Sequence, residues 1–112
     1  MNVLRALVLL IGLAGVGQAV LQDVREFELA LKRLQGKSII NSVNLEDGET
    51  RFQAVIPLAR RYGAALVVGC IDEDKEQAQA ITRQRKLEIA LRSAQILTEK
   101  YHVPIEDIYF DP

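Results

Sequence analysis

Residues 65–71 read Ala-Leu-Val-Val-Gly-Cys-Ile and are apolar on both alternations. A strand with this pattern has both of its faces covered, as the strands of a parallel sheet do. Two shorter runs, residues 38–43 and 108–110, are rich in β-branched or aromatic side chains. The sequence therefore predicts strands at these three places.

Helical spacing of apolar residues fills the intervals before and between these strands. The spacing predicts helices over residues 24–35 and 49–62, and Pro57 should kink the second or remove one of its hydrogen bonds. A third helix is expected to begin after Thr82, a capping residue, and to end at the sequence His102-Val-Pro. The buried stripe expected on this third helix consists of Leu87, Ala90, Leu91, Ala94, Leu97 and Tyr101.

The order of elements is helix–strand–helix–strand–helix–strand, with connections of only a few residues. Alternation of this kind produces parallel strands joined by right-handed crossovers. With 112 residues the chain is at most one domain, and residues 23–112 are the part that shows the alternation. The sequence therefore predicts an α/β fold.

The composition is that of an ordinary globular protein, with 49% hydrophobic residues, 26% charged residues and a net charge of −1. Basic residues form no block and aromatic residues are few, which argues against a nucleic-acid partner. Cys70, the single cysteine, lies in an apolar run and is expected to be a small core residue. His102 has no neighbouring metal ligands, so no metal site is expected. A solvated helix face is expected to hold Arg83, Arg85, Lys86 and Arg92.

Residues 1–22 form a leader that differs from the rest, because one charged residue, Arg5, precedes a continuous apolar stretch. Three interpretations stay open. The leader could be a secretory signal, since small residues follow its apolar region. It could instead be a strand or helix of the α/β core, or sequence from a truncated or frame-shifted gene start that belongs to no fold.

Polar side chains stand at or just beyond the carboxyl end of each predicted strand: Asn41 and Asn44 at the first, Asp72 at the second and Asp111 at the third. Ligands of parallel α/β folds bind at this end of the strands, so these side chains are candidates for one rim. Amides and carboxylates suit a neutral, hydrogen-bonding heterocycle better than a phosphate or a metal. The alternative is that they are turn and capping residues, although Asn41 lies within an apolar strand and should be buried with partners.

Long collinear stretches of the chain resemble one known family, and they include Gln-Gly-Lys-Ser-Ile-Ile-Asn-Ser-Val-Asn at residues 35–44 and Ile-Tyr-Phe-Asp-Pro at residues 108–112. The family is the pterin-binding domain of cobalamin-dependent methionine synthase, which is related to dihydropteroate synthase. The resemblance implies a (β/α)₈ TIM barrel that binds 5-methyltetrahydrofolate at its C-terminal face, and residues 23–112 offer about three of the eight βα units. The resembling stretches are residues 31–49, 61–69, 71–76, 82–90 and 104–112.

The resemblance also implies roles for single residues. Asn41, in an Ile-Asn-Ser motif, would hydrogen-bond the pterin ring, and Asp111, in a Phe-Asp-Pro motif, would accept from its amino-pyrimidine edge. Asn44 and Asp72 would line the site nearby. The family's Asp-Ser-Ser motif is missing, because residues 20–22 read Val-Leu-Gln in its place.

The function that the resemblance implies is methyl transfer from 5-methyltetrahydrofolate to cobalamin and then to homocysteine. The chain is expected to be a cytoplasmic, folate-binding fragment of a methionine synthase that is not active alone. No catalytic residue and no cofactor are expected on it, since cobalamin and zinc belong to other modules of the family enzyme. One alternative is an oligomeric or partner-completed folate-binding module. Another is an exported α/β protein with a vestigial site, if residues 1–22 act as a signal peptide.

Overall fold

The computed structural model describes residues 8–10 and 18–112, and it describes side chains from residue 24 onward. None of the helices in these ranges is long and apolar enough to cross a membrane. The elements, in order, are β1 (Val8–Leu10), α1 (Gln18–Arg33), β2 (Ile39–Val43), α2 (Thr50–Tyr62), β3 (Ala65–Gly69), α3 (Arg83–Gln95), a π-helical turn (Ile96–Lys100), a 3₁₀ turn (Ile105–Asp107) and β4 (Ile108–Asp111).

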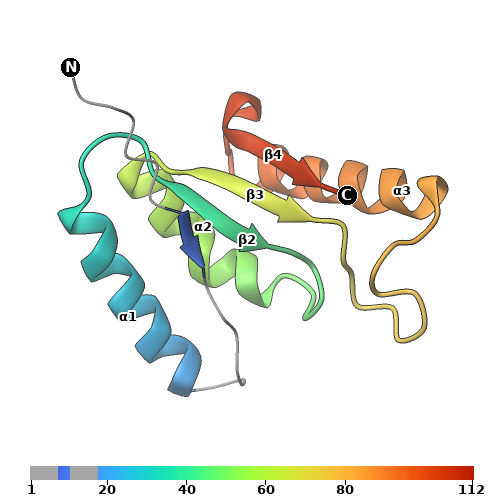
Figure 1. Ribbon diagram of the computed structural model, residues 1–112, viewed down its shortest axis with the longest axis horizontal. Coiled ribbons are helices and arrows are strands. Elements are labelled where there is room, and N and C mark those ends of the chain that lie inside the picture. Colours follow the sequence, from blue (N-terminus) through green and yellow to red (C-terminus); the bar gives the residue numbers. More distant parts are fainter. Residues whose placement is uncertain (1–7, 11–17) are drawn as a thin grey trace.

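The strands form one parallel sheet in the order β1-β2-β3-β4, so each strand pairs with its neighbours in the sequence. Right-handed crossovers between such strands place the intervening helices on one face of the sheet. Figure 1 shows α2 behind β2 and β3, and α3 behind β4. The prediction of an α/β fold with parallel strands is confirmed, and the described strands form an open sheet rather than a closed barrel.

The bounds of the strands lie close to those expected, whereas α1 begins at Gln18 instead of residue 24. The apolar N-terminal stretch also contributes β1, which pairs in parallel with β2. The interpretations of residues 1–22 as a signal peptide or as gene-start sequence fall largely on residues 1–7 and 11–17. These lie outside the described residues, so both interpretations stay predictions.

The core lies between the helices and one face of the sheet. Ile40, Leu66 and Ile108 form one row across β2, β3 and β4, and all are buried. Phe52 and Ile56 of α2 belong to the same cluster and are fully buried. Burial of an apolar side chain of this size contributes about 1.5–3 kcal/mol, so this face of the sheet holds the helices in place.

The end of α2 sets the start of β3. Gly63 adopts a left-handed conformation with φ of 67°. The backbone N–H of Ala64 donates to the carbonyl of Ala59 over 2.8 Å, and that of Gly63 donates to Arg60 over 3.4 Å. This is the hydrogen-bond pattern of a glycine-terminated helix. Pro57 lies at an exposed position inside α2, and the helix continues past it.

The buried stripe expected on α3 is partly wrong. Ile89, Ser93 and Leu97 are buried, whereas Leu87 is 48% exposed and Leu91 is 69% exposed. The helix turns its i, i+4, i+8 row towards the sheet, where β3 and β4 lie. Because β4 is the outermost described strand, no described element covers the flank that carries Leu87 and Leu91.

The two ends of the third helical segment follow the expectations. Thr82 caps α3, since its Oγ1 accepts a hydrogen bond from the backbone N–H of Arg85 over 3.2 Å. The last turn widens into the π-helical turn Ile96–Lys100. His102 then takes a positive φ of 55° and redirects the chain towards β4.

Candidate functional site

The two faces of the sheet differ in what covers them. The face opposite the helices carries a row of three residues, Asn41 on β2, Val67 on β3 and Tyr109 on β4. Val67 pairs with each of the other two. Asn41 and Val67 are partly buried, and Tyr109 is 55% exposed. Gly69 and Asp111 form the next row on this face, because side chains alternate along a strand. We call this surface, from Asn41 to Asp111, the open face.

The open face brings together the two residues with implied pterin contacts, Asn41 and Asp111. Asp111 follows Tyr109 by two positions on β4, so both project to the same side. Asn41 pairs with Val67, which pairs in turn with Tyr109. The strands that carry Asn41 and Asp111 are therefore about 10 Å apart at the usual strand spacing. A ligand that stands over β3 would reach both side chains.

Asn41 is only partly buried, so the expectation of a buried amide is wrong. Its peptide bond to Ser42 is cis, and the pairing of β2 with β3 shifts register between Asn41 and Val43. Among residues 24–112 its side chain forms no hydrogen bond. The amide is thus available to donate to a ligand and to accept from it.

Asp111 presents an exposed carboxylate on a fixed backbone. Its main-chain carbonyl accepts a hydrogen bond from the N–H of Cys70 over 3.3 Å, which extends the pairing of β3 with β4. Its side chain forms no ion pair within the part of the chain that the structure describes. A carboxylate in this setting can accept two hydrogen bonds from adjacent N–H groups of a ligand.

Asn44 is placed beside this face but serves a local turn. It is buried, and its Oδ1 accepts a hydrogen bond from the backbone N–H of Glu46 over 2.9 Å. A side chain that binds the backbone two residues ahead stabilises a turn in its own right. This contact explains why an asparagine is found at position 44 even if it binds no ligand. The implied role of Asn44 in lining the site stays a prediction.

Asp72 is buried, and both of its carboxylate oxygens have protein partners. Oδ1 accepts from the backbone N–H of Asp74 over 3.1 Å, and Oδ2 accepts from Nη2 of Arg85 over 2.8 Å. The expectation that Arg85 belongs to a solvated face is therefore wrong. Asp72 fixes the loop after β3 to the start of α3, and its role towards a ligand stays a prediction.

The rest of the acidic loop is also held by the protein. Oδ1 of Asp74 accepts from the backbone N–H groups of Glu76 and Gln77, both over 2.8 Å, and these bonds lower the pKa of Asp74. Glu73 accepts two hydrogen bonds from Arg92, over 3.1 and 2.8 Å, and this guanidinium lowers the pKa of Glu73. Asp74 is thus a turn residue, and Glu73 pairs with a side chain of α3.

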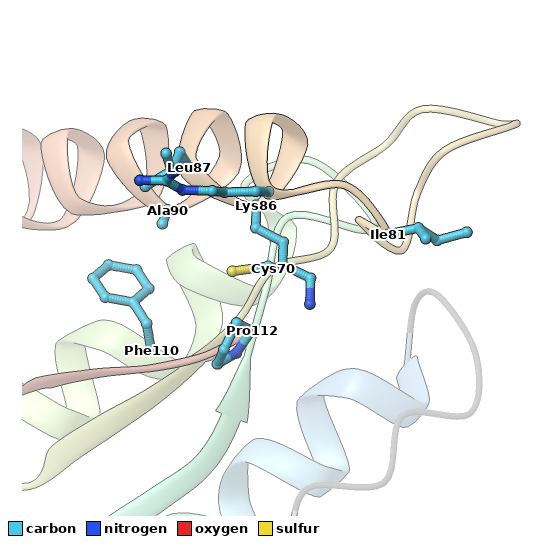
Figure 2. Close-up of a pocket in the computed structure, with 8 residues that line it drawn as sticks. Cys70, Ile81, Lys86, Leu87, Ala90, Phe110 and Pro112 are labelled. Carbon is cyan, nitrogen blue, oxygen red and sulfur yellow. The ribbon is translucent and has the colours of Figure 1, made fainter.

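A separate hollow of about 570 Å³ lies between α3 and the end of β4. Figure 2 shows the Cys70 sulfur in this hollow, between Phe110 and α3. Burial raises the pKa of the Cys70 thiol, and nearby Lys86 acts in the opposite direction. Phe110 precedes Asp111 on the strand and so projects to the helix side, which separates the hollow from the open face. Its lining residues are Cys70, Ile81, Arg83, Lys86, Leu87, Ala90, Phe110 and Pro112.

A comparison of the sequence with known protein families identifies a family that matches it. The family model described as "Pterin binding enzyme" matches residues 22–112. The matched range contains β2, β3 and β4 and therefore the whole open face. A family of this kind implies a pterin-like or folate-like small molecule as the ligand.

Proposed function

Because this match shows that the chain belongs to the pterin-binding enzymes, we propose that its open face binds the pterin ring of 5-methyltetrahydrofolate. The observation that supports this most directly is the placement of Asn41 and Asp111 on one exposed sheet face. Neither side chain is engaged by another described residue, in contrast to Asn44 and Asp72. Free polar groups on a surface built by three strands are what a rigid heterocycle requires.

The chemistry of the two side chains fits the pterin ring. The Asp111 carboxylate accepts hydrogen bonds only, and the amino-pyrimidine edge of a pterin presents adjacent N–H donors. The Asn41 amide both donates and accepts, so it can pair with the mixed donor and acceptor edge of the ring. A bond between a charged carboxylate and an N–H group is stronger than a neutral one. Asp111 should therefore contribute more to affinity than Asn41.

Within the family, we place the chain with the methionine synthases, on the resemblance of residues 31–49 and 104–112. In that setting the folate held by this chain would supply the methyl group that passes to cobalamin and then to homocysteine. The cobalamin and zinc modules of such an enzyme lie outside this domain, so the role of this chain is to hold the folate. The open four-stranded sheet would then be one part of a (β/α)₈ barrel.

Isothermal titration of the purified chain with 5-methyltetrahydrofolate tests the proposal, together with thermal unfolding followed by circular dichroism. A ligand that binds only the folded chain raises the unfolding midpoint. Asp111→Asn should weaken binding by about tenfold or more, because it removes a hydrogen bond to a charged group, which contributes about 1.5–3 kcal/mol. Glu106→Gln, the same chemical change at an exposed residue away from the open face, should leave binding unchanged. Equal affinities for the two variants would contradict the proposal.

A second candidate function is a folate-binding module that another polypeptide, or a second copy, completes. The observation that favours it is the uncovered flank beside β4, where Leu87, Leu91 and Phe110 are large, apolar and exposed. β4 also has a free edge in the described sheet, and such edges pair readily with other strands. Sedimentation velocity over a range of concentrations tests this candidate. A folate affinity that rises with the oligomer population would favour it over binding by single chains.

A further inference from the structure

We propose that Tyr109 is a further ligand-binding residue, whose ring stacks against the heterocycle held by Asn41 and Asp111. This inference rests on the proposed function and adds a residue to the same site. Neither the implied motif roles nor the family match assigns Tyr109 to it. The structure places this residue two positions from Asp111 and in the same row as Asn41, on the face that they share.

The position of Tyr109 follows from the pairing of the strands. It shares a row with Asn41, with Val67 between them on β3. It also lies two positions before Asp111, so its side chain projects to the same side of β4. Side chains on a strand stand roughly perpendicular to the sheet. The Tyr109 ring therefore stands beside the surface over Val67, on the same strand as Asp111 and across β3 from Asn41.

The exposure of Tyr109 distinguishes it from the other tyrosines. The Tyr62 hydroxyl donates a hydrogen bond to Glu28 over 3.0 Å, and the Tyr101 hydroxyl donates one to Glu49 over 3.2 Å. Both tyrosines are also partly buried. Tyr109 is 55% exposed, and within the described residues its hydroxyl has no hydrogen-bond partner. The core and the hydrogen bonds of the described chain therefore do not account for an aromatic ring at this position.

The chemistry of a pterin accounts for it. The ring is flat and conjugated in its pyrimidine half, and its polar groups lie at the edge. Edge contacts with Asn41 and Asp111 leave the flat surface exposed, and an aromatic side chain is the usual partner of such a surface. Tyr109 would thus exclude water from one side of the ring and restrict its tilt, while the polar residues fix its orientation.

Titration of the full chain with 5-methyltetrahydrofolate and with folic acid tests this inference through two substitutions. Tyr109→Val removes the ring but keeps a β-branched strand residue, and it should weaken binding by about tenfold, the lower part of the range for base stacking. Tyr109→Phe keeps the ring and should bind within about twofold of the original chain. In NMR spectra, the upfield shift of the bound folic acid ring proton should be lost in Tyr109→Val alone.

Phe110→Val is the matched control, because it removes an aromatic ring from the next residue on the opposite face of β4. It should leave affinity unchanged even if it lowers the unfolding midpoint. Tyr109→Val should retain the unliganded midpoint, since the side chain is largely exposed. If the original chain binds folate and Tyr109→Val binds it equally well, the inference is wrong while the proposed function stands. If the original chain binds neither ligand, the proposed function itself fails.

Discussion

Arg85 donates a hydrogen bond from Nη2 to Oδ2 of Asp72 across 2.8 Å, and the pair joins the first turn of α3 to the loop after β3. Asp72 is buried, and its other oxygen holds the backbone of Asp74. The hydrogen bond to Asp72 raises the pKa of Arg85, which is therefore charged at every pH of interest. A buried carboxylate with two protein partners acts first as a structural residue.

Replacing either partner should lower stability more than it lowers folate binding. Arg85→Gln removes the hydrogen-bonded cation of the buried Asp72 carboxylate and leaves only Arg92, whose Nη1 lies 3.9 Å from Oδ2. It should reduce the free energy of unfolding by about 1–3 kcal/mol. Its affinity for 5-methyltetrahydrofolate at low temperature should stay within about twofold, because the open face is unchanged. Urea unfolding and titration calorimetry measure the two quantities on the same protein. A loss of affinity without a loss of stability would instead place Asp72 in the binding site.

The exposed flank of α3 should control self-association. Leu87→Gln combined with Leu91→Gln removes the two exposed leucines while it keeps residues that favour helices. Any self-association through this flank should weaken by about tenfold, whereas stability should change by less than about 1 kcal/mol, as for other exposed positions. Sedimentation velocity measures the first effect and thermal unfolding the second. Leu29→Gln, on exposed Leu29 of α1, is the control and should not alter association.

Sequence patterns predicted the parts of the fold that depend on local preference. The strand at Ala65–Gly69 and the glycine-terminated end of α2 follow from residues next to one another in the chain. The stripe on α3 was misjudged because its apolar residues cover more than one side of the helix. Which side is buried depends on the position of β4 at the edge of the described sheet. That position is a property of the tertiary structure, and no local spacing records it.

The candidate site shows the same division. Polar residues at the carboxyl ends of parallel strands are expected to share a rim, and this rule identified Asn41 and Asp111. The pairing of the strands places both residues on one face of the sheet. The rule could not separate them from Asp72, whose partner Arg85 lies beyond a folded loop. It also missed Tyr109, because an aromatic residue in a short strand is expected in the core. Only its pairing with Val67 on the open face, and its exposure there, indicate another use.

The Cys70 thiol should react slowly with thiol reagents. Burial is the main cause that raises its pKa, and the charge of Lys86 partly offsets this effect. Lys86→Glu replaces the favourable charge with an unfavourable one, so it should raise the pKa further and slow the reaction. The rate of modification by a disulfide reagent, followed from pH 7 to pH 10, measures both effects. A faster reaction in Lys86→Glu than in the original chain would show that access, and not charge, limits the thiol.

The acid side of the stability profile should depend on Glu49. Its Oε1 accepts from Nζ of Lys100 over 2.8 Å and from the hydroxyl of Tyr101 over 3.2 Å, which ties the start of α2 to the π-helical turn. The bond from Lys100 is the main cause that lowers the pKa of Glu49 below its ordinary 4.5. A lowered pKa in the folded state means that the contribution of Glu49 is fully present above pH 4.5 and is lost as the pH falls below it.

The partners of Glu49 set the other limit. The bond to Glu49 raises the pKa of Lys100 above 10.5, so its contribution is present below that pH and is lost as the pH rises through the raised value. Glu49→Gln should therefore unfold at a lower temperature than the original chain between about pH 5 and pH 10, and the difference should shrink beyond both limits. Thermal unfolding at pH 3, 7 and 11 measures this, with Glu106→Gln as the exposed control. A difference that is the same at pH 3 and pH 7 would mean that the Glu49 charge does not stabilise this contact.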